Sequence, residues 1–388
     1  MRIGLAIETD APGGAETMLL HLARELGRAG HHVVAFGPAG GPGWLTARLR
    51  ELGVERELIE AHGYRHTTRI VRDLAGRLRR HRLDVLHSHE FAMSVFGAMA
   101  ARLAGCRHVI TMHGSTYFAE HPRRLAALRL AAALSDHTVA VSRSLRAGLA
   151  EQLRMSPHAV RFVPNGVQGT PGSGDGVKQE LGLAPDDVLV LAVGSLYPVK
   201  GHAVLIDAVA GMEPAARPFV AIAGSGFEED NLRGRIEARG VQDRVRLLGY
   251  RADVPDLLAA ADIYVMPSLS EGMPMAMIEA MLAARPVLAS DTGGIGELIS
   301  GPELGMLVPP GDPAALRRGI LKLAGDPALR ARLGEAGRRR AEADFTATAM
   351  AERYVRLYED GAGAAEPVPR TRAPISPREA KAKPLRDA

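Results

Sequence analysis

Residues 261–294 read ADIYVMPSLSEGMPMAMIEAMLAARPVLASDTGG, and this stretch decides the fold. An apolar run at 263–266 predicts a buried strand, and a Gly/Pro loop follows it. Residues 275–284 are good helix formers without Gly or Pro, so they predict a helix. A second apolar run at 287–289 predicts another strand, which leads into a Gly-Gly loop. Strands that alternate with helices in this way are typical of a parallel sheet covered by its connecting helices.

Two carboxylates frame the loop and the helix. Glu271 lies in the loop, and Glu279 lies about two turns into the helix. Pro274 suits the first helical turn, whose unpaired N–H groups favour a phosphate. One carboxylate can therefore accept hydroxyl donors near the phosphate end of a ligand, and the other can accept them further along. A sugar nucleotide presents its sugar, diphosphate and ribose in that order.

This pattern resembles the E-x7-E motif of retaining GT-B glycosyltransferases of family 4 (GT4), and matches to that family continue in order over residues 194–311. The resemblance implies an α/β fold of the GT-B type, with two Rossmann-like domains whose parallel sheets face an interdomain cleft. It implies transfer of a sugar from a nucleotide-diphosphate sugar. Glu271 would orient the sugar and Glu279 would hold the ribose, while the donor-binding loop would include Gly272, Met273 and Pro274.

Composition limits the class of protein. A chain of 388 residues is too long for one ordinary core, so two domains are expected. The single cysteine, Cys106, excludes an intrachain disulfide and a cysteine-based zinc site. Residues 1–8 do not form a signal peptide, and no uncharged apolar stretch approaches the length that spans a bilayer. We therefore expect a cytoplasmic protein, with attachment to the inner face of the cell membrane left open.

Charge is distributed unevenly along the chain. Residues 1–166 hold 22 Lys and Arg against 14 Asp and Glu, whereas residues 167–360 hold 20 against 27. A basic first half indicates an anionic partner, such as an anionic membrane or a lipid-phosphate acceptor, and nucleic acid is not the partner we expect. The residues at 65–82 form a candidate basic helix, for which an exposed soluble helix is the preferred interpretation. Only five of the 48 basic residues are Lys, so Arg is favoured along the whole chain, and coding composition rather than a binding role is the alternative explanation.

Strand and helix alternate in both halves of the chain, which predicts two parallel sheets. The first half carries apolar runs at 3–8, 32–37, 84–89, 108–113, 138–142 and 160–163, and the second carries them at 188–193, 219–223, 245–248, 263–266 and 287–289. The expected division is an acceptor-side domain at 1–166, a linker at 167–177, a donor domain at 178–342, a helix crossing back at 343–360, and a disordered tail at 361–388.

Two motifs of the first half carry chemistry. Gly13 and Gly14 follow the first strand and open a helix, where glycines let a ligand approach the backbone. The resemblance places them against the donor diphosphate. It also places His113, at a strand end, beside the transferred sugar as a catalytic residue. His87 and His89 share one strand face; a metal pair is conceivable there, but a structural or acceptor-side role is preferred, because the resemblance implies no metal.

The second half supplies the remaining donor-binding candidates. Lys200 matches the family lysine that stabilises the leaving diphosphate. Ser195 occupies the place of a common arginine, so it brings a hydroxyl but no charge. Gly224 belongs to another strand-end glycine loop, and Tyr250 and Arg251 follow the next strand, where the family presents backbone groups to the base.

The expected function is retaining transfer from a nucleotide sugar to a glycan, lipid-linked or small-molecule acceptor, in bacterial-type cell-surface polysaccharide or glycolipid synthesis. No cofactor or metal is expected. The catalytic residues are His113, Lys200 and Glu271. Alternatives are a non-catalytic GT-B scaffold, which only Ser195 favours, and a GT-B sugar-nucleotide epimerase. A nicotinamide dehydrogenase is excluded because Gly-x-Gly-x-x-Gly does not follow the first strand.

Overall fold

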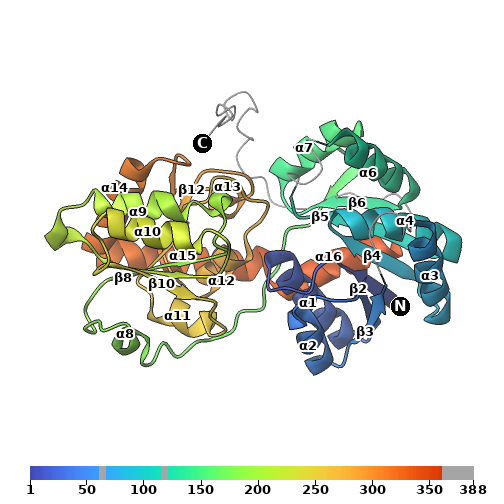
Figure 1. Cartoon of the computed structure of the whole chain (residues 1–388), viewed down its shortest axis with the longest axis horizontal. Coiled ribbons are helices and arrows are strands. Elements are labelled where there is room, and N and C mark those ends of the chain that lie inside the picture. Colours follow the sequence, from blue (N-terminus) through green and yellow to red (C-terminus); the bar gives the residue numbers. More distant parts are fainter. Residues whose placement is uncertain (61–66, 115–120, 361–388) are drawn as a thin grey trace.

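The computed structural model describes residues 1–60, 67–114 and 121–360, and it contains two wholly parallel sheets joined by helices (Figure 1). The pairing of two Rossmann-like domains, predicted from the strand–helix alternation, is confirmed. Long apolar runs become strands buried on both faces, as parallel sheets require. The first sheet contains β1 (Arg2–Ala6), β2 (His32–Pro38), β3 (Glu55–Ile59), β4 (Val85–His89), β5 (Arg107–Met112), β6 (His137–Ala140) and β7 (Val160–Phe162). The second contains β8 (Leu189–Val193), β9 (Phe219–Ala223), β10 (Val245–Gly249), β11 (Ile263–Met266), β12 (Val287–Ser290) and β13 (Met306–Val308).

Both sheets reverse their strand order at one point. The first runs β3-β2-β1-β4-β5-β6-β7 and the second runs β10-β9-β8-β11-β12-β13. The reversals fall between β1 and β4 and between β8 and β11. In such sheets, ligands bind at the carboxyl ends of the strands beside the reversal. We therefore expect one ligand-binding crevice in each sheet, at the carboxyl ends of the strands beside its reversal.

Two strands are missing from the sequence prediction. β3 reads ERELI and has one buried residue, Ile59, because it is the charged outer strand of its sheet. β13 has three residues and also lies at a sheet edge. Edge strands bury less surface, so their hydrophobic pattern is weak.

The helices cover the sheets. Those associated with the first sheet are α1 (Gly14–Arg28), α2 (Trp44–Glu51), α3 (Thr67–Arg80), α4 (Phe91–Ala104), α6 (Pro122–Leu134) and α7 (Arg143–Leu153). Those that follow are α8 (Val177–Glu180), α9 (His202–Ala210), α10 (Glu229–Ala238), α11 (Val254–Ala260), α12 (Met275–Leu282), α13 (Ile295–Leu298), α14 (Pro313–Gly325), α15 (Pro327–Asp344) and α16 (Ala347–Glu359). Short 3-10 helices occupy Pro198–Lys200 and Pro214–Ala216.

The helix between the two glutamates is shorter than its sequence predicts. α12 ends at Leu282 rather than at residue 284, because Ala284 adopts a left-handed conformation with φ of 56°. The N–H of Arg285 then bonds to the carbonyl of Ala280, which closes the helix end. Pro274 is also one position earlier than predicted, at the N-cap rather than in the first turn.

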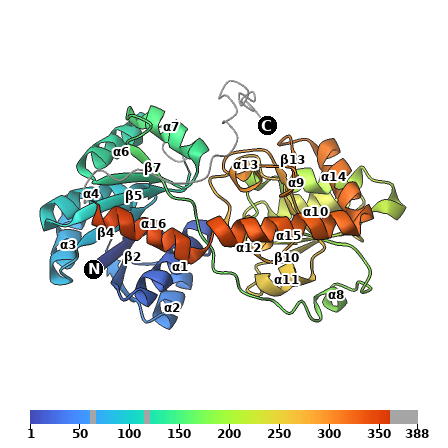
Figure 2. The ribbon, with the colours of Figure 1, turned by 180° about the vertical axis from the view of Figure 1, so that it is seen from behind.

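The last two helices connect the domains. Figure 2 shows α15 and α16 end to end along the back of the molecule, with α15 on the second domain and α16 on the first. Tyr354 and Tyr358 on α16 are buried, and the helix packs against α1. The hydroxyl of Tyr358 lies 2.7 Å from Nδ1 of His87, which ties the end of the described chain to β4.

The apolar side of the basic helix α3 is packed inside the first domain. Ile70, Val71, Leu74 and Leu78 are buried in a cluster with residues of the first sheet. Its amphipathic pattern is therefore explained by packing within the domain. Residues 65 and 66 lie outside the described residues, as does the tail at 361–388. Among the described helices none is both long and apolar enough to cross a membrane.

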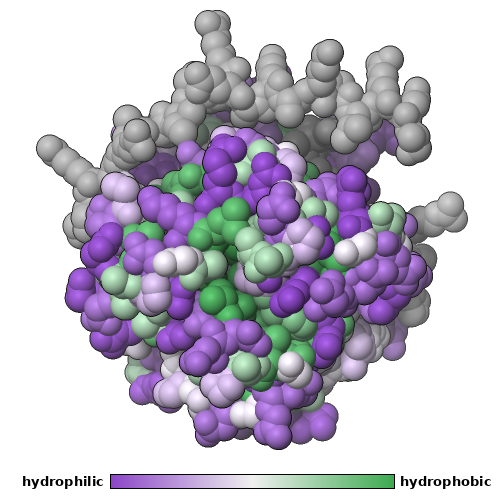
Figure 3. All heavy atoms as spheres, turned by 90° about the vertical axis from the view of Figure 1, so that its left-hand side faces the viewer, coloured by the Kyte–Doolittle hydropathy of each residue, from purple (hydrophilic) through white to green (hydrophobic). Residues whose placement is uncertain are grey.

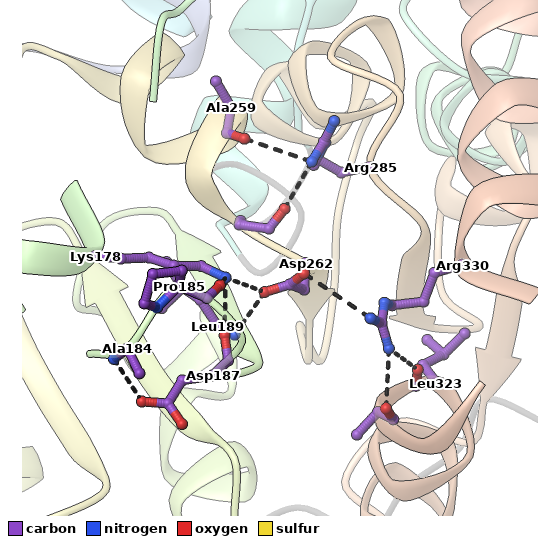
Figure 4. A network of polar contacts seen from close by, with 12 residues as sticks. Lys178, Ala184, Pro185, Asp187, Leu189, Ala259, Asp262, Arg285, Leu323 and Arg330 are labelled. Carbon is purple, nitrogen blue, oxygen red and sulfur yellow. Dashed lines mark hydrogen bonds and ion pairs between the residues drawn. The ribbon is translucent and has the colours of Figure 1, made fainter. Parts of the chain in front are cut away.

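A polar network holds the amino-terminal ends of the second sheet. Asp262 accepts from Lys178 Nζ at 3.1 Å and from the N–H of Leu189 at 2.9 Å, and Arg330 approaches its other oxygen (Figure 4). This end of the sheet is opposite the carboxyl ends that are expected to bind ligand. The outer face of the second domain is mixed, with apolar side chains grouped among polar ones (Figure 3).

Candidate active site

Lys200 and Glu271 form an ion pair at the carboxyl ends of the second sheet. Lys200 ends the short helix after β8, and its Nζ lies 2.7 Å from Oε1 of Glu271 in the loop after β11. The hydroxyl of Ser268 donates to the same oxygen at 2.8 Å. The Glu271 side chain is 7% exposed and that of Lys200 is 28% exposed, so the carboxylate is fixed while the ammonium group is accessible. The sequence predicted both residues, but not their contact.

Glu279 lies in a different environment from Glu271. It is half-buried, and burial raises the pKa of its carboxyl group to about 7. No hydrogen bond to this carboxylate occurs among the described residues. Tyr264 of β11 is fully buried, and its pKa is raised by burial and by the negative charges of Glu279 and Glu271. Tyr264 is therefore close enough to both glutamates for their negative charges to raise its pKa.

His113 follows β5 and faces the second domain. A Cβ built on Gly272 would lie 2.1 Å from the carbonyl oxygen of His113, so the Glu271 loop touches the first domain here. The His113 ring is half-buried, and burial lowers its pKa to about 4. Its Nε2 lies 3.1 Å from Nδ1 of His89. At neutral pH the ring is uncharged, and it can donate or accept one hydrogen bond without carrying charge.

The paired histidines of β4 are part of a buried hydrogen-bond chain. His87 contacts Tyr358 through Nδ1 and Thr111 through Nε2, both at 2.7 Å. Thr111 in turn lies 3.0 Å from the hydroxyl of Tyr354. These contacts agree with the structural role preferred for His87, while His89 supports His113. The group of possible metal ligands found among the described residues lies elsewhere, at Glu55, Glu57 and His81.

The glycine loop of the first domain opens α1. Gly13 is the N-cap and Gly14 the first helical residue, and a Cβ on Gly14 would lie 3.8 Å from Met275 of the second domain. Glu16 accepts a hydrogen bond from Thr9 and is buried. Burial and the neighbouring Glu8 and Asp10 raise the pKa of Glu16. The first domain therefore brings both a helix N-terminus and carboxylates to this junction.

The loops after β8, β9 and β10 lie side by side. The N–H of Gly224 donates to the carbonyl of Gly249 at 2.8 Å, and Ser195 is half-buried beside them. The hydroxyl of Tyr250 accepts from Nε1 of Trp44 at 2.8 Å, a contact between the two domains. The guanidinium of Arg251 is not available to bind a phosphate, because it pairs with Glu180 at 2.5 Å and with Asp253 at 2.5 Å.

Several contacts at the junction were not found from the sequence. The amide of Asn165 donates to the carbonyl of Met273 at 2.8 Å, which anchors the donor loop to the end of the first domain. Ser268 supports Glu271 through its hydroxyl, and Tyr264 is buried where both glutamates raise its pKa. Glu297 binds the backbone of the first domain. These roles depend on contacts between distant parts of the chain, so neither spacing nor residue type indicated them.

The chain matches two known family models. Residues 12–168 match the model described as Glycosyltransferase Family 4, and residues 175–340 match the one described as Glycosyl transferases group 1. The chain is 28% identical over 271 residues to the UDP-Gal:alpha-D-GlcNAc-diphosphoundecaprenol alpha-1,3-galactosyltransferase of Escherichia coli, covering 65% of this chain and 69% of the relative. It is 31% identical over 303 residues to the D-inositol 3-phosphate glycosyltransferase of Streptomyces avermitilis, covering 70% of this chain and 65% of the relative.

A solved structure shares the whole architecture. The crystal structure of Anabaena HepE in complex with UDP superposes with a TM-score of 0.81 and 24% identity, covering 92% of this chain and 99% of HepE. At this identity the likeness establishes the fold. The fold is also that of the solved structure of the glycosyltransferase WaaG, with a TM-score of 0.71 and 18% identity, covering 92% of this chain and 100% of WaaG.

Proposed function

Because the chain belongs to the group 1 glycosyltransferases, which transfer sugars from nucleotide sugars, we propose that it uses a UDP-sugar and retains the anomeric configuration. The observation that carries this proposal is the Lys200–Glu271 pair, which Ser268 supports and which lies next to Gly272, the residue packed on the His113 carbonyl. It offers a cation for a leaving diphosphate and a fixed carboxylate for sugar hydroxyls. UDP is favoured because one relative is named for UDP-Gal and HepE was solved with UDP.

In the proposed reaction, Lys200 and the N-termini of α1 and α12 stabilise the diphosphate as it leaves. Glu271 orients the sugar, and Glu279 accepts hydroxyl donors from the ribose. The donor also contacts the backbone near Gly13, Gly14, Gly224, Gly272 and Tyr250. Ser195 contributes a hydroxyl, and Arg251 contributes its backbone because its side chain is engaged by Glu180 and Asp253.

Retention without a covalent intermediate fits this arrangement. A double displacement needs a carboxylate nucleophile beneath the anomeric carbon. Glu271 is already bound by Lys200 and Ser268, which makes it a weaker nucleophile. We therefore assign attack of the acceptor to the face from which the phosphate leaves, with the phosphate taking the acceptor proton. His113, neutral at pH 7, binds a hydroxyl of the transferred sugar, and the reaction uses no metal or cofactor.

For the acceptor we propose a glycan, lipid-linked or small-molecule hydroxyl compound of cell-surface glycan synthesis. The names of the two relatives support this, since one acts on a diphosphoundecaprenol-linked sugar and the other on D-inositol 3-phosphate. The excess of basic residues in the first half fits a phosphate-bearing acceptor, and it also fits peripheral contact with an anionic membrane at the cytoplasmic face.

The test is a panel of UDP-, GDP- and ADP-sugars, with nucleotide release and the anomeric configuration of the released sugar read together. We expect nucleotide release only from the UDP-sugar, and we expect the released sugar to keep the anomeric configuration of the donor. A chelator should leave the rate of release unchanged. If none of the donors released its nucleotide, the catalytic assignment would be contradicted. An inverted product would contradict the proposed stereochemistry. Lipid-diphosphate and inositol-phosphate acceptors would then be compared for stimulation of release.

A further inference from the structure

Glu297 belongs to the second domain, but its carboxylate caps a helix of the first. Its Oε1 accepts hydrogen bonds from the N–H of Arg143 at 2.6 Å and from the N–H of Ser144 at 3.1 Å. These are the first two residues of α7. The third N–H of that turn, from Leu145, is satisfied within the domain by Ser142 Oγ at 3.1 Å. The helix start is thus completed by a residue more than 150 positions further along the chain.

The physical basis of this contact is strong. A helix N-terminus carries unpaired N–H groups and positive partial charge, and a carboxylate satisfies both. Hydrogen bonds from N–H groups to an ionised carboxylate are stronger than those to a neutral acceptor. Burial raises the pKa of Glu297, and the two N–H contacts act in the opposite direction. The contact exists only while the two domains are together.

The backbone beside this cap is packed in layers. A Cβ on Gly294 would lie 2.0 Å from the carbonyl oxygen of Gly272 and 2.9 Å from Cβ of Ser142. Gly272 in turn lies against the carbonyl of His113. The contacts therefore run from His113 of the first domain through Gly272 and Gly294 of the second domain and back to Ser142 of the first. No side chain separates these segments, so a small displacement of the domains changes the distance between His113 and Glu271.

We propose that Glu297 is a positioning residue that clamps the second domain to α7 and so holds the Glu271 loop against His113. The proposal rests on the proposed roles of His113 and Glu271 in sugar transfer. Glu297 lies in α13, three residues beyond Gly294, which is the N-cap of that helix and packs on Gly272. Its cap fixes that segment to the first domain, and the segment fixes the position of Glu271. Glu297 itself contacts neither reacting group.

Two substitutions separate the clamp from a purely local effect. Glu297→Leu removes both hydrogen bonds, whereas Glu297→Gln retains an oxygen that can accept from both N–H groups. The matched control is Glu303→Leu, an exposed glutamate shortly after α13. The distance between domains is measured by pulsed electron paramagnetic resonance, with spin labels at Arg72→Cys on α3 and Glu213→Cys in the second domain, in a Cys106→Ser background with verified activity.

In Glu297→Leu, we expect the distance distribution to broaden toward longer values and kcat/KM for transfer to fall about tenfold or more. The loss should fall mainly on kcat, because the donor still binds to the second domain. Glu297→Gln should keep the narrow distribution and most of the activity, and Glu303→Leu should behave as the parent protein. An unchanged distribution in Glu297→Leu would overturn the clamp. Broadening with unchanged kcat would overturn its positioning role.

The same assay distinguishes failure of the proposed function. If His113→Ala and Glu271→Ala leave transfer unchanged, the assignment of the reacting site fails. The distance measurement still judges the clamp in that case, because it does not depend on activity. A broadened distribution would then show a clamp between domains, and a positioning role at Glu271 would be excluded.

Discussion

The carboxyl ends of the two sheets hold their functional side chains in different ways. In the second domain, Glu271 is fixed by Lys200 and Ser268, which lie in neighbouring strand-end loops of the same sheet. In the first domain, His113 is supported by His89, beside a buried chain of His87, Thr111 and two tyrosines from α16. The surroundings of Glu271 are therefore assembled within the second domain, whereas those of the histidines depend on contacts with α16. Substitutions at the ion pair of the second domain should therefore reduce activity, whereas substitutions in the buried chain of the first domain should reduce stability.

The largest effect is expected at the ion pair. Lys200→Ala and Glu271→Ala should each reduce kcat for donor turnover by about 100-fold or more, because a preorganised charge is lost where charge develops. Circular dichroism should report an unchanged fold. Lys322→Ala, an exposed lysine of α14, is the matched control and should retain full turnover. Near-parental turnover in both site variants would contradict the donor-side assignment.

Glu279 should affect binding more than turnover. Glu279→Gln is expected to raise the donor KM about tenfold, with a smaller change in kcat, because a charged acceptor for ribose hydroxyls is lost. With a pKa of about 7 in the empty protein, the carboxyl is partly protonated at neutral pH. Donor hydroxyls favour the charged form, so binding should release part of a proton at pH 7. Calorimetry in buffers of different ionisation enthalpy measures this release, which Glu279→Gln should abolish.

The same carboxyl gives a stability prediction with a defined sign. Its pKa in the folded chain is raised from the ordinary 4.5 to about 7, so its contribution to stability is full below pH 4.5 and is lost as the pH rises through 7. The free energy of unfolding of Glu279→Gln should therefore rise relative to the parent protein across this window. Denaturant titrations at pH 5 and pH 8 would check it, and an opposite trend would contradict the burial of this group.

Tyr358 tests the first domain. Tyr358→Phe should lower stability by about 1–3 kcal/mol, because the buried Nδ1 of His87 loses its partner. Donor turnover per folded molecule should change little. Tyr197→Phe is the control, since Tyr197 is 45% exposed. A large loss of turnover at unchanged stability would mean that α16 acts on the site directly.

The smallest effect is expected where the domains touch at the surface. Tyr250→Phe removes the hydrogen bond from Trp44 and should change the donor KM by less than about threefold, because exposed hydrogen bonds compete with water. Steady-state kinetics at two salt concentrations would check it. A tenfold change would show that this contact, rather than the backbone near Tyr250, dominates binding on this side.

The sequence predicted the second domain better than the first for a physical reason. β9 and β11 have the predicted limits, because a strand buried on both faces is an uninterrupted apolar run. Lys200 and Glu271 were found as separate residues from local motifs. Their ion pair depends on the pairing of β8 with β11, which cannot be read from the sequence.

Contacts between distant segments were beyond sequence reasoning. His87 and Tyr358 are 271 residues apart, and Glu297 lies 154 residues from Arg143. The same is true of the early end of α12, where a left-handed Ala284 overrides good helix formers. The pairing of the Arg251 side chain with Glu180 and Asp253 was likewise not predicted, because Glu180 lies 71 residues away in the sequence.

We propose that His113 of the first domain and Glu271 of the second share one sugar site. A double-mutant cycle on kcat/KM measures this directly, with His113→Ala, Glu271→Ala and the combined variant assayed for donor turnover. We expect strong coupling: the combined variant should lose little more activity than the more damaging single substitution. If the two losses simply multiply, the residues act independently and the shared site is contradicted.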